Sequence, residues 1–96
     1  MIKSFKDKVT QDIYNSENTK GARRVPKDIH AVAKRKLDMI HFSAKLIDLQ
    51  VPPANRLEAL KGNLKGYHSI RINDQWRIVF QWTEQGAENV QIIDYH

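Results

Sequence analysis

The three residues Asp94-Tyr95-His96 carry side chains that could transfer protons or donate hydrogen bonds. A carboxylate, a phenol and an imidazole follow one another at the end of a strand-like run that begins near Asn89. An imidazole titrates near neutral pH, so His96 is suited to act as a general acid or base. Placed beside arginines, the three groups could perform metal-free chemistry on a phosphate.

Strands must position these groups, because the hydrophobic pattern beyond Pro52-Pro53 repeats every two residues. The alternation predicts three consecutive antiparallel strands over residues 67–72, 76–82 and 90–95, joined by turns at 73–75 and 84–87. A weaker strand is expected over residues 57–62.

The first of the two turns decides which side chains of neighbouring strands meet. A three-residue turn pairs Ile72 with Trp76, so that apolar side chains of both strands share the core side. Arg71 then lies opposite Arg77 on the other side of the sheet. Like charges in this arrangement destabilise a strand pair by about 0.2–1 kcal/mol unless an anion lies between them. Arginine can grip a phosphate through two parallel hydrogen bonds.

The second turn brings the end of the sequence to the arginines. Pairing Trp82 with Val90 places Arg77 opposite Tyr95, and a turn longer or shorter by two residues would change this register. The two registers together predict one cluster on the sheet face away from the helices, comprising Arg71, Arg77 and Tyr95, with His96 and Lys61 close by.

The first half of the chain is predicted to be mostly helical. A short strand over 1–5 and a short helix over 7–15 precede a polar, flexible loop over 15–26. Apolar spacings of three and four predict a helix over 29–49 capped by Asp28, or a second, shorter helix beginning at Ser43. The expected fold is one α+β domain over residues 1–96, with an N-terminal strand and helices packed on one face of a largely antiparallel sheet.

Composition excludes several kinds of site. The 96 residues include no cysteine, which excludes disulfides, thiolate metal sites and cysteine nucleophiles. His30, His41 and His68 show no convergent ligand spacing, so no metal site is expected. No apolar run approaches the roughly 20 residues of a membrane span, and no signal peptide is evident. A cytoplasmic protein is therefore expected.

The charge distribution favours a polyanionic partner, above all a nucleic acid. The net charge is +5, and residues 20–36 hold seven basic side chains against the single acid Asp28. Three of the basic residues, Lys20, Arg23 and Arg24, fall in the predicted loop. We expect them to contact RNA or a protein partner.

Several segments resemble the HigB toxins of the RelE/ParE superfamily, which belong to type II toxin–antitoxin systems. The resemblance spans the whole chain and is strongest over the last 45 residues. It is carried by residues 55–62 (Asn-Arg-Leu-Glu-Ala-Leu-Lys-Gly), residues 67–78 (Tyr-His-Ser-Ile-Arg-Ile-Asn-Asp-Gln-Trp-Arg-Ile), the final Asp-Tyr-His and the opening Met-Ile-Lys-Ser-Phe. Within these toxins the chain is most similar to the branch that includes GraT.

The resemblance implies a microbial RNase-like fold and cleavage of mRNA, usually in the ribosomal A site, with no metal or organic cofactor. It also implies a HigA-like antitoxin whose helix-turn-helix domain binds operator DNA, so that the toxin reaches that DNA indirectly. Residues matching the motifs of HigB toxins are Lys61, Arg77, Asp94, Tyr95 and His96.

Glu58 departs from the pattern, since some HigB toxins carry an activity-linked histidine there. The resemblance therefore implies that its role passes to Glu58 or His96, or that RNase activity is weakened.

The hypothetical mechanism is attack of a ribose 2′-OH on the adjacent phosphorus. Arg71, Arg77 and Lys61 would stabilise the phosphorane, while His96 or Glu58 would take the proton. Tyr95 would align the ribose, and Asp94 would orient His96. The alternative is a ParE-like or other toxin that blocks growth by binding a cellular target without cleaving RNA.

Overall fold

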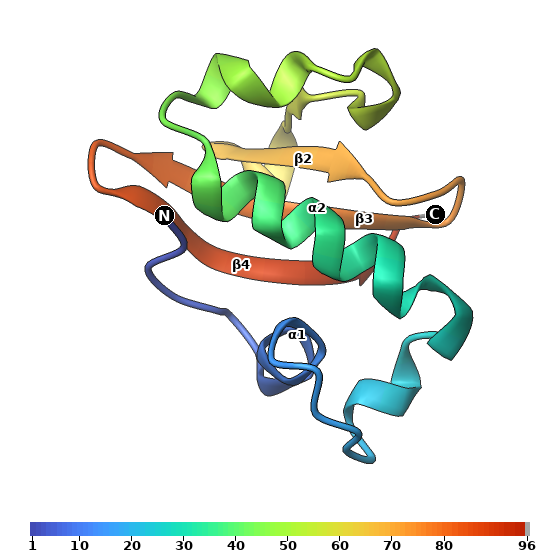
Figure 1. Cartoon of the computed structure of the whole chain (residues 1–96). Helices are drawn as coiled ribbons and strands as arrows, with labels where there is room; N and C mark the ends of the chain where they lie inside the picture. The colour runs from blue at the N-terminus through green and yellow to red at the C-terminus, as the bar shows by residue number, and fades with distance from the viewer. Residues whose placement is uncertain (96) are drawn as a thin grey trace.

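The computed structural model describes residues 1–95 and is built around a four-stranded antiparallel sheet (Figure 1). The strands lie side by side in chain order: β1 (Glu58–Ala59), β2 (Tyr67–Arg71), β3 (Trp76–Thr83) and β4 (Gly86–Asp94). β3 is central and β1 is very short, so the predicted strand over 57–62 forms only in part. The three longer strands are confirmed.

Two helices cover one face of this sheet, as predicted for an α+β fold. α2 (His30–Phe42) crosses the face, and α1 (Lys8–Tyr14), which is viewed almost end-on in Figure 1, packs beside β4 and against α2. α1 begins at Asp7, whose carboxylate accepts a hydrogen bond from Thr10 N, a common N-cap arrangement. Leu37 of α2 is fully buried in the same core as Phe80 of β3.

The predicted long helix is wrong in its second half, and the alternative of a break at Ser43 is nearer to the structure. α2 ends at Phe42, and Ser43 has extended backbone while its hydroxyl donates to Met39 O (2.6 Å). A 3₁₀ helix, η3 (Leu46–Gln50), follows. Asp28 does not cap α2; it lies in the 3₁₀ turn η2 (Lys27–Ile29), and α2 has no side-chain cap.

The segment over 15–26 is more ordered than the predicted loop. It contains the 3₁₀ turn η1 (Ala22–Arg24), and Ala22 and Val25 are buried in the core. Thr19 anchors it, because its hydroxyl donates to Asp12 (2.7 Å) and accepts from Ala22 N (3.1 Å). Burial of these two apolar side chains therefore orders a segment whose composition is otherwise typical of a flexible loop.

The N-terminal segment lies beside β4 but forms no regular strand. Two isolated parallel bridges, from Ile2 to Ala87 and from Phe5 to Val90, replace the predicted strand over 1–5. Between them, Ser4 Oγ accepts a hydrogen bond from Asn89 N (2.9 Å), at the point where β4 bulges. The bulge of β4 at Asn89 therefore separates the two bridges that the N-terminal segment makes with this strand.

The first predicted register is confirmed and the second is wrong by two residues. Arg71 pairs with Arg77 across β2 and β3. Across β3 and β4, however, Arg77 pairs with Ile93, because the turn contains only Glu84 and Gln85. A bulge at Asn89, which has a left-handed φ of 53°, adds one residue to β4.

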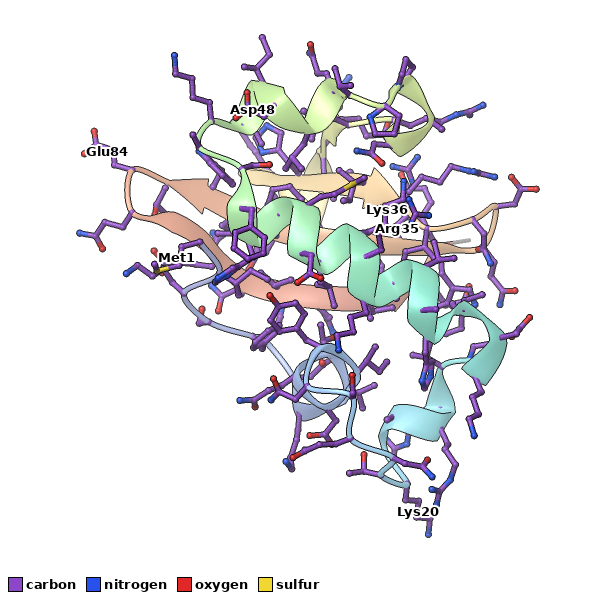
Figure 2. The ribbon with its side chains drawn as sticks, viewed as in Figure 1. Met1, Lys20, Arg35, Lys36, Asp48 and Glu84 are labelled. Carbon is purple, nitrogen blue, oxygen red and sulfur yellow. The ribbon has the colours of Figure 1, made fainter. Side chains whose placement is uncertain are left out.

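The connection from α2 to β1 is held by a buried polar contact. Lys36, which is almost fully buried, donates from Nζ to the side-chain oxygen of Asn55. The Asn55 amide in turn donates to Leu49 O (3.2 Å) and Val51 O (3.5 Å), so one side chain ties η3, η4 (Pro53–Asn55) and α2 together. Figure 2 shows Lys36 on α2 beside the end of β2. Another 3₁₀ turn, η5 (Gly62–Leu64), connects β1 to β2.

We expect Asn55→Ala to lower the free energy of unfolding by about 2–3 kcal/mol, because it leaves the buried Lys36 ammonium without its acceptor. Chemical denaturation monitored by tryptophan fluorescence measures this. The exposed Asn63→Ala is the matched control and should change stability little. Equal stabilities for the two variants would contradict the role of Asn55.

Gly86 is required where the N-terminal segment meets the β3–β4 turn. Its φ is +135°, and a Cβ there would come within 2.1 Å of Met1 O. Gly86→Ala should therefore destabilise the protein by about 2–3 kcal/mol, from backbone strain together with a steric clash. Gly66, with φ +93° and open space around it, is the control for strain alone, at about 1 kcal/mol. Equal losses in thermal melts would contradict the clash.

Candidate active site

The buried guanidinium of Arg77 is the centre of the polar face of the sheet, opposite the helices. Arg77 is 8% exposed, and its Nη1 contacts three oxygens from separate parts of the chain. They are Ser69 Oγ on β2 (2.6 Å), Glu58 Oε1 on β1 (2.7 Å) and the Arg56 carbonyl (3.5 Å). A charge at this depth needs such partners, since an unpaired buried charge is very costly.

The strands place these partners through their registers. Glu58 pairs with Ser69 across β1 and β2, and Arg77 lies on β3 diagonally opposite Ser69. Side chains of alternate residues point to the same face, so all three reach the side away from α2. Arg56 has a left-handed backbone (φ 46°), which turns the chain from η4 into β1.

Part of the Arg77 guanidinium remains available. All three contacts use Nη1, and within residues 1–95 neither Nη2 nor Nε donates a hydrogen bond. These two groups form one edge of the planar fork, which is the geometry that binds two oxygens of a phosphate.

Tyr95 covers the guanidinium despite the shifted register. Arg77 Cζ lies 4.9 Å from the centre of the Tyr95 ring, a cation–π distance. The backbone extends past the end of β4, where Tyr95 N donates to Gln75 O (2.6 Å). Tyr95 is 42% exposed, so it lies at the mouth of the site. Its approach is diagonal, two residues beyond the directly paired Ile93.

Arg71 faces Arg77 at the backbone, but its guanidinium forms an ion pair with Asp74 in the β2–β3 turn. This hydrogen bond and the positive charge lower the pKa of the Asp74 carboxyl below its usual value. The two arginines therefore each have their own carboxylate, Asp74 and Glu58, in place of the single anion expected between them.

The remaining predicted residues are not all brought together. Asp94, at the end of β4, accepts a hydrogen bond from the Gln75 amide (3.1 Å) and therefore lies beside the Tyr95 backbone. Lys61 is exposed three residues beyond Glu58 and makes no ion pair within the described chain. His96 lies outside the described residues.

The basic loop is far from this site. Lys20 projects from the lower tip of the molecule in Figure 2, at the opposite end from η3 and the strands β1 and β2. Arg23 and Arg24 are exposed, and Arg23 contacts the neighbouring Asn18 (3.2 Å). These residues form a surface separate from Arg77.

Sequence reasoning missed three contributors to the site: Ser69, the Arg56 carbonyl and Gln75. Strand alternation puts Ser69 on the same face as Arg71, so the confirmed β2–β3 register could have identified Ser69 as a neighbour of Arg77. No side-chain pattern indicates a backbone carbonyl. Tyr67, on the same face, lies under the Lys6 ammonium at 5.7 Å, which adds a cation from the N-terminal segment.

Residues 1–95 contain no group of three or more histidines, carboxylates or thiols that could hold a metal ion. None of the helices in this part of the chain is long and apolar enough to cross a membrane.

Two proteins with similar sequences carry the name HigB. Toxin HigB-1 of Vibrio cholerae is 41% identical over 92 residues, covering 96% of this chain and 95% of that protein. Endoribonuclease HigB of Proteus vulgaris is 32% identical over 102 positions, covering both chains completely.

Among solved structures, the YoeB–YefM complex from Staphylococcus aureus contains a similar fold. Its TM-score is 0.61 at 21% identity, and the match covers 100% of this chain and 95% of that chain. The family described as the RelE-like toxin of type II toxin-antitoxin system HigB matches residues 3–96. The chain therefore belongs to the HigB-like family of RelE-like toxins of type II toxin–antitoxin systems.

Proposed function

We propose that this toxin is an endoribonuclease that cleaves mRNA on the ribosome without a metal ion. The observation that carries the proposal is the Arg77 guanidinium, which holds Glu58 at 2.7 Å and Tyr95 at 4.9 Å while Nη2 and Nε stay open. A cation, a carboxylate and a phenol thus surround one point on an accessible face. The name of the Proteus vulgaris relative, endoribonuclease HigB, supports the same activity.

The reaction is an internal transfer. The ribose 2′-oxygen attacks the adjacent phosphorus and loses its proton, and the bond from phosphorus to the 5′-oxygen breaks as that oxygen gains a proton. The products are a 2′,3′-cyclic phosphate and a 5′-hydroxyl. Negative charge builds on the two non-bridging oxygens, and donors fixed there in advance commonly give the largest catalytic contribution.

Arg77 is proposed to bind the non-bridging oxygens through Nη2 and Nε, with Arg71 and Lys61 adding positive charge. For Arg71 to do so, its guanidinium must leave Asp74. The Tyr95 phenol then aligns the ribose or assists proton transfer.

The proton acceptor is proposed to be Glu58 or His96. Glu58 is 47% exposed at its side chain, so its second carboxylate oxygen is accessible to a ribose. Asp94, which is held at the end of β4 by Gln75, is proposed to orient His96. Because Glu58 stands where some HigB toxins carry a histidine, we expect weaker RNase activity than in those toxins.

The proposed partner is a HigA-like helix-turn-helix antitoxin, through which the toxin reaches operator DNA in the cytoplasm. The YefM partner in the structurally similar complex supports an antitoxin contact. The exposed residues Lys20, Arg23 and Arg24, remote from Arg77, are proposed to contact the antitoxin or RNA.

Cleavage of ribosome-bound mRNA, followed by mapping of RNA 5′ ends in the presence of EDTA, tests the proposal. We expect the wild type to cleave with EDTA present. Arg77→Ala should lose at least about 100-fold in rate, the scale for one lost oxyanion donor, and Tyr95→Ala about 100-fold, the scale for a lost proton-transfer group. Lys3→Ala, which removes an exposed cation near the β3–β4 turn, is the control and should cleave normally.

Full activity in both site variants, or abolition of cleavage by EDTA, would refute the scheme. Thermal melts must show that the variants fold, because Arg77 is buried. Growth arrest with DNA damage and intact mRNA would instead favour the ParE-like alternative.

A further inference from the structure

A cluster of basic side chains lies around the C-terminal end of β2, at Arg71. We call it the basic edge and define it as Arg35, Lys36, Arg56 and Arg71. Arg35 and Lys36 come from α2, Arg56 from the turn into β1 and Arg71 from the last position of β2. Figure 2 shows the two α2 residues together beside the end of β2.

The four cations of the basic edge share one electrostatic environment. Burial lowers the pKa of Lys36, and the charges of Arg35 and Arg71 lower it further. The pKa of Asp74 is lowered by its hydrogen bond from Arg71 and also by the charge of Arg56. Arg71 thus lies within electrostatic reach of Lys36 and of the exposed Asp74 carboxylate, which Arg56 also reaches.

Asp74 is the acid paired with this cluster, and it is held weakly. Its side chain is 99% exposed, and its ion pair with Arg71 joins residues three apart at the β2–β3 turn. Exposed pairs of this kind contribute little to stability because water screens them. A polyanion, which brings several negative charges to the cluster, can therefore displace this single carboxylate.

The basic edge is continuous with the site at Arg77. Arg71 is the cross-strand partner of Arg77, and the Arg56 carbonyl accepts a hydrogen bond from Arg77 Nη1 (3.5 Å). Lys36 holds Asn55, which directly precedes Arg56. A chain with a phosphate at regular intervals can therefore contact the site and the edge together.

We propose that the basic edge is a second phosphate-binding subsite, which takes the RNA backbone next to the scissile phosphate. In the free protein the Arg71 guanidinium is paired with Asp74; when RNA binds, it leaves Asp74 and lies between the two subsites, where it contacts the neighbouring phosphate and adds charge beside the scissile one. This inference rests on the proposed function. Arginines favour phosphate here, because the planar fork donates two parallel hydrogen bonds to two oxygens. The buried Lys36 supplies charge and supports Asn55.

Binding of a fluorescent 2′-O-methyl oligoribonucleotide tests the subsite, since this RNA has no 2′-OH and cannot be cleaved. Fluorescence anisotropy is measured over a salt series. Arg35→Gln and Arg56→Gln should each reduce the slope of log K against log salt by about 0.7, the value per phosphate for a single strand. Asp74→Asn should tighten binding about two- to fivefold, because no exposed ion pair must then be broken.

The matched controls lie near the β3–β4 turn, away from the basic edge. Lys3→Ala removes a cation and Glu84→Gln removes an acid, and neither should change the slope or the affinity beyond about 1.5-fold. Thermal melts of all variants establish that they are folded.

Unchanged slopes for both arginine variants, or unchanged or weaker binding for Asp74→Asn, would overturn the subsite. Loss of affinity for an acidic antitoxin with unchanged RNA binding would also overturn it. Cleavage by the wild type is measured separately. If the wild type cleaves and the slopes are unchanged, only the subsite fails; if the slopes change and nothing is cleaved, only the proposed function fails.

Discussion

Burial of the Arg77 charge is the constraint on which the polar face of this protein depends. A guanidinium on a central strand must be neutralised and hydrogen-bonded, and Ser69, Glu58 and the Arg56 carbonyl meet that need at one nitrogen. The short strand β1 and the left-handed turn at Arg56 serve this arrangement, since they bring Glu58 over β2. These contacts use Nη1, so Nη2 and Nε make no hydrogen bond within residues 1–95, and the Tyr95 ring lies 4.9 Å from Cζ.

The helical face of the sheet supports this arrangement indirectly. Asn55 links α2 to the turn that carries Arg56, so the packing of the helix fixes the position of a backbone carbonyl on the other side of the sheet. The bulge at Asn89 is compensated by Ser4, and it lets both Ala87 and Val90 face the core while Tyr95 still reaches Arg77. The bulge thus allows β4 to contribute to the apolar core on one face and to the Arg77 site on the other.

Period-two alternation predicted the three long strands and the face that carries Arg71, Arg77 and Tyr95. It could not predict the second register, because the turn is two residues shorter than expected and the bulged Asn89, with its positive φ, adds a residue that the side-chain pattern does not reveal. The helix break at Ser43 was predicted only as an alternative, because the apolar spacing continues beyond it; in the structure α2 ends at Phe42, which is 78% exposed.

The site was predictable only where it depends on strand alternation. The convergence of Arg77 with Tyr95 is found, although through a diagonal contact and not the expected direct pairing. The separate carboxylates of Glu58 and Asp74 were missed as counter-ions, because pairing across a turn or an edge strand depends on side-chain directions that a linear pattern does not contain.

The single-turnover rate of ribosome-bound mRNA cleavage by Arg77→Lys is the most direct test of the central claim. Lysine keeps the positive charge but lacks the planar fork that serves the buried oxygens and a phosphate together. We expect a folded protein whose cleavage rate falls at least about 100-fold. A folded Arg77→Lys variant that cleaves within threefold of the wild type would contradict it.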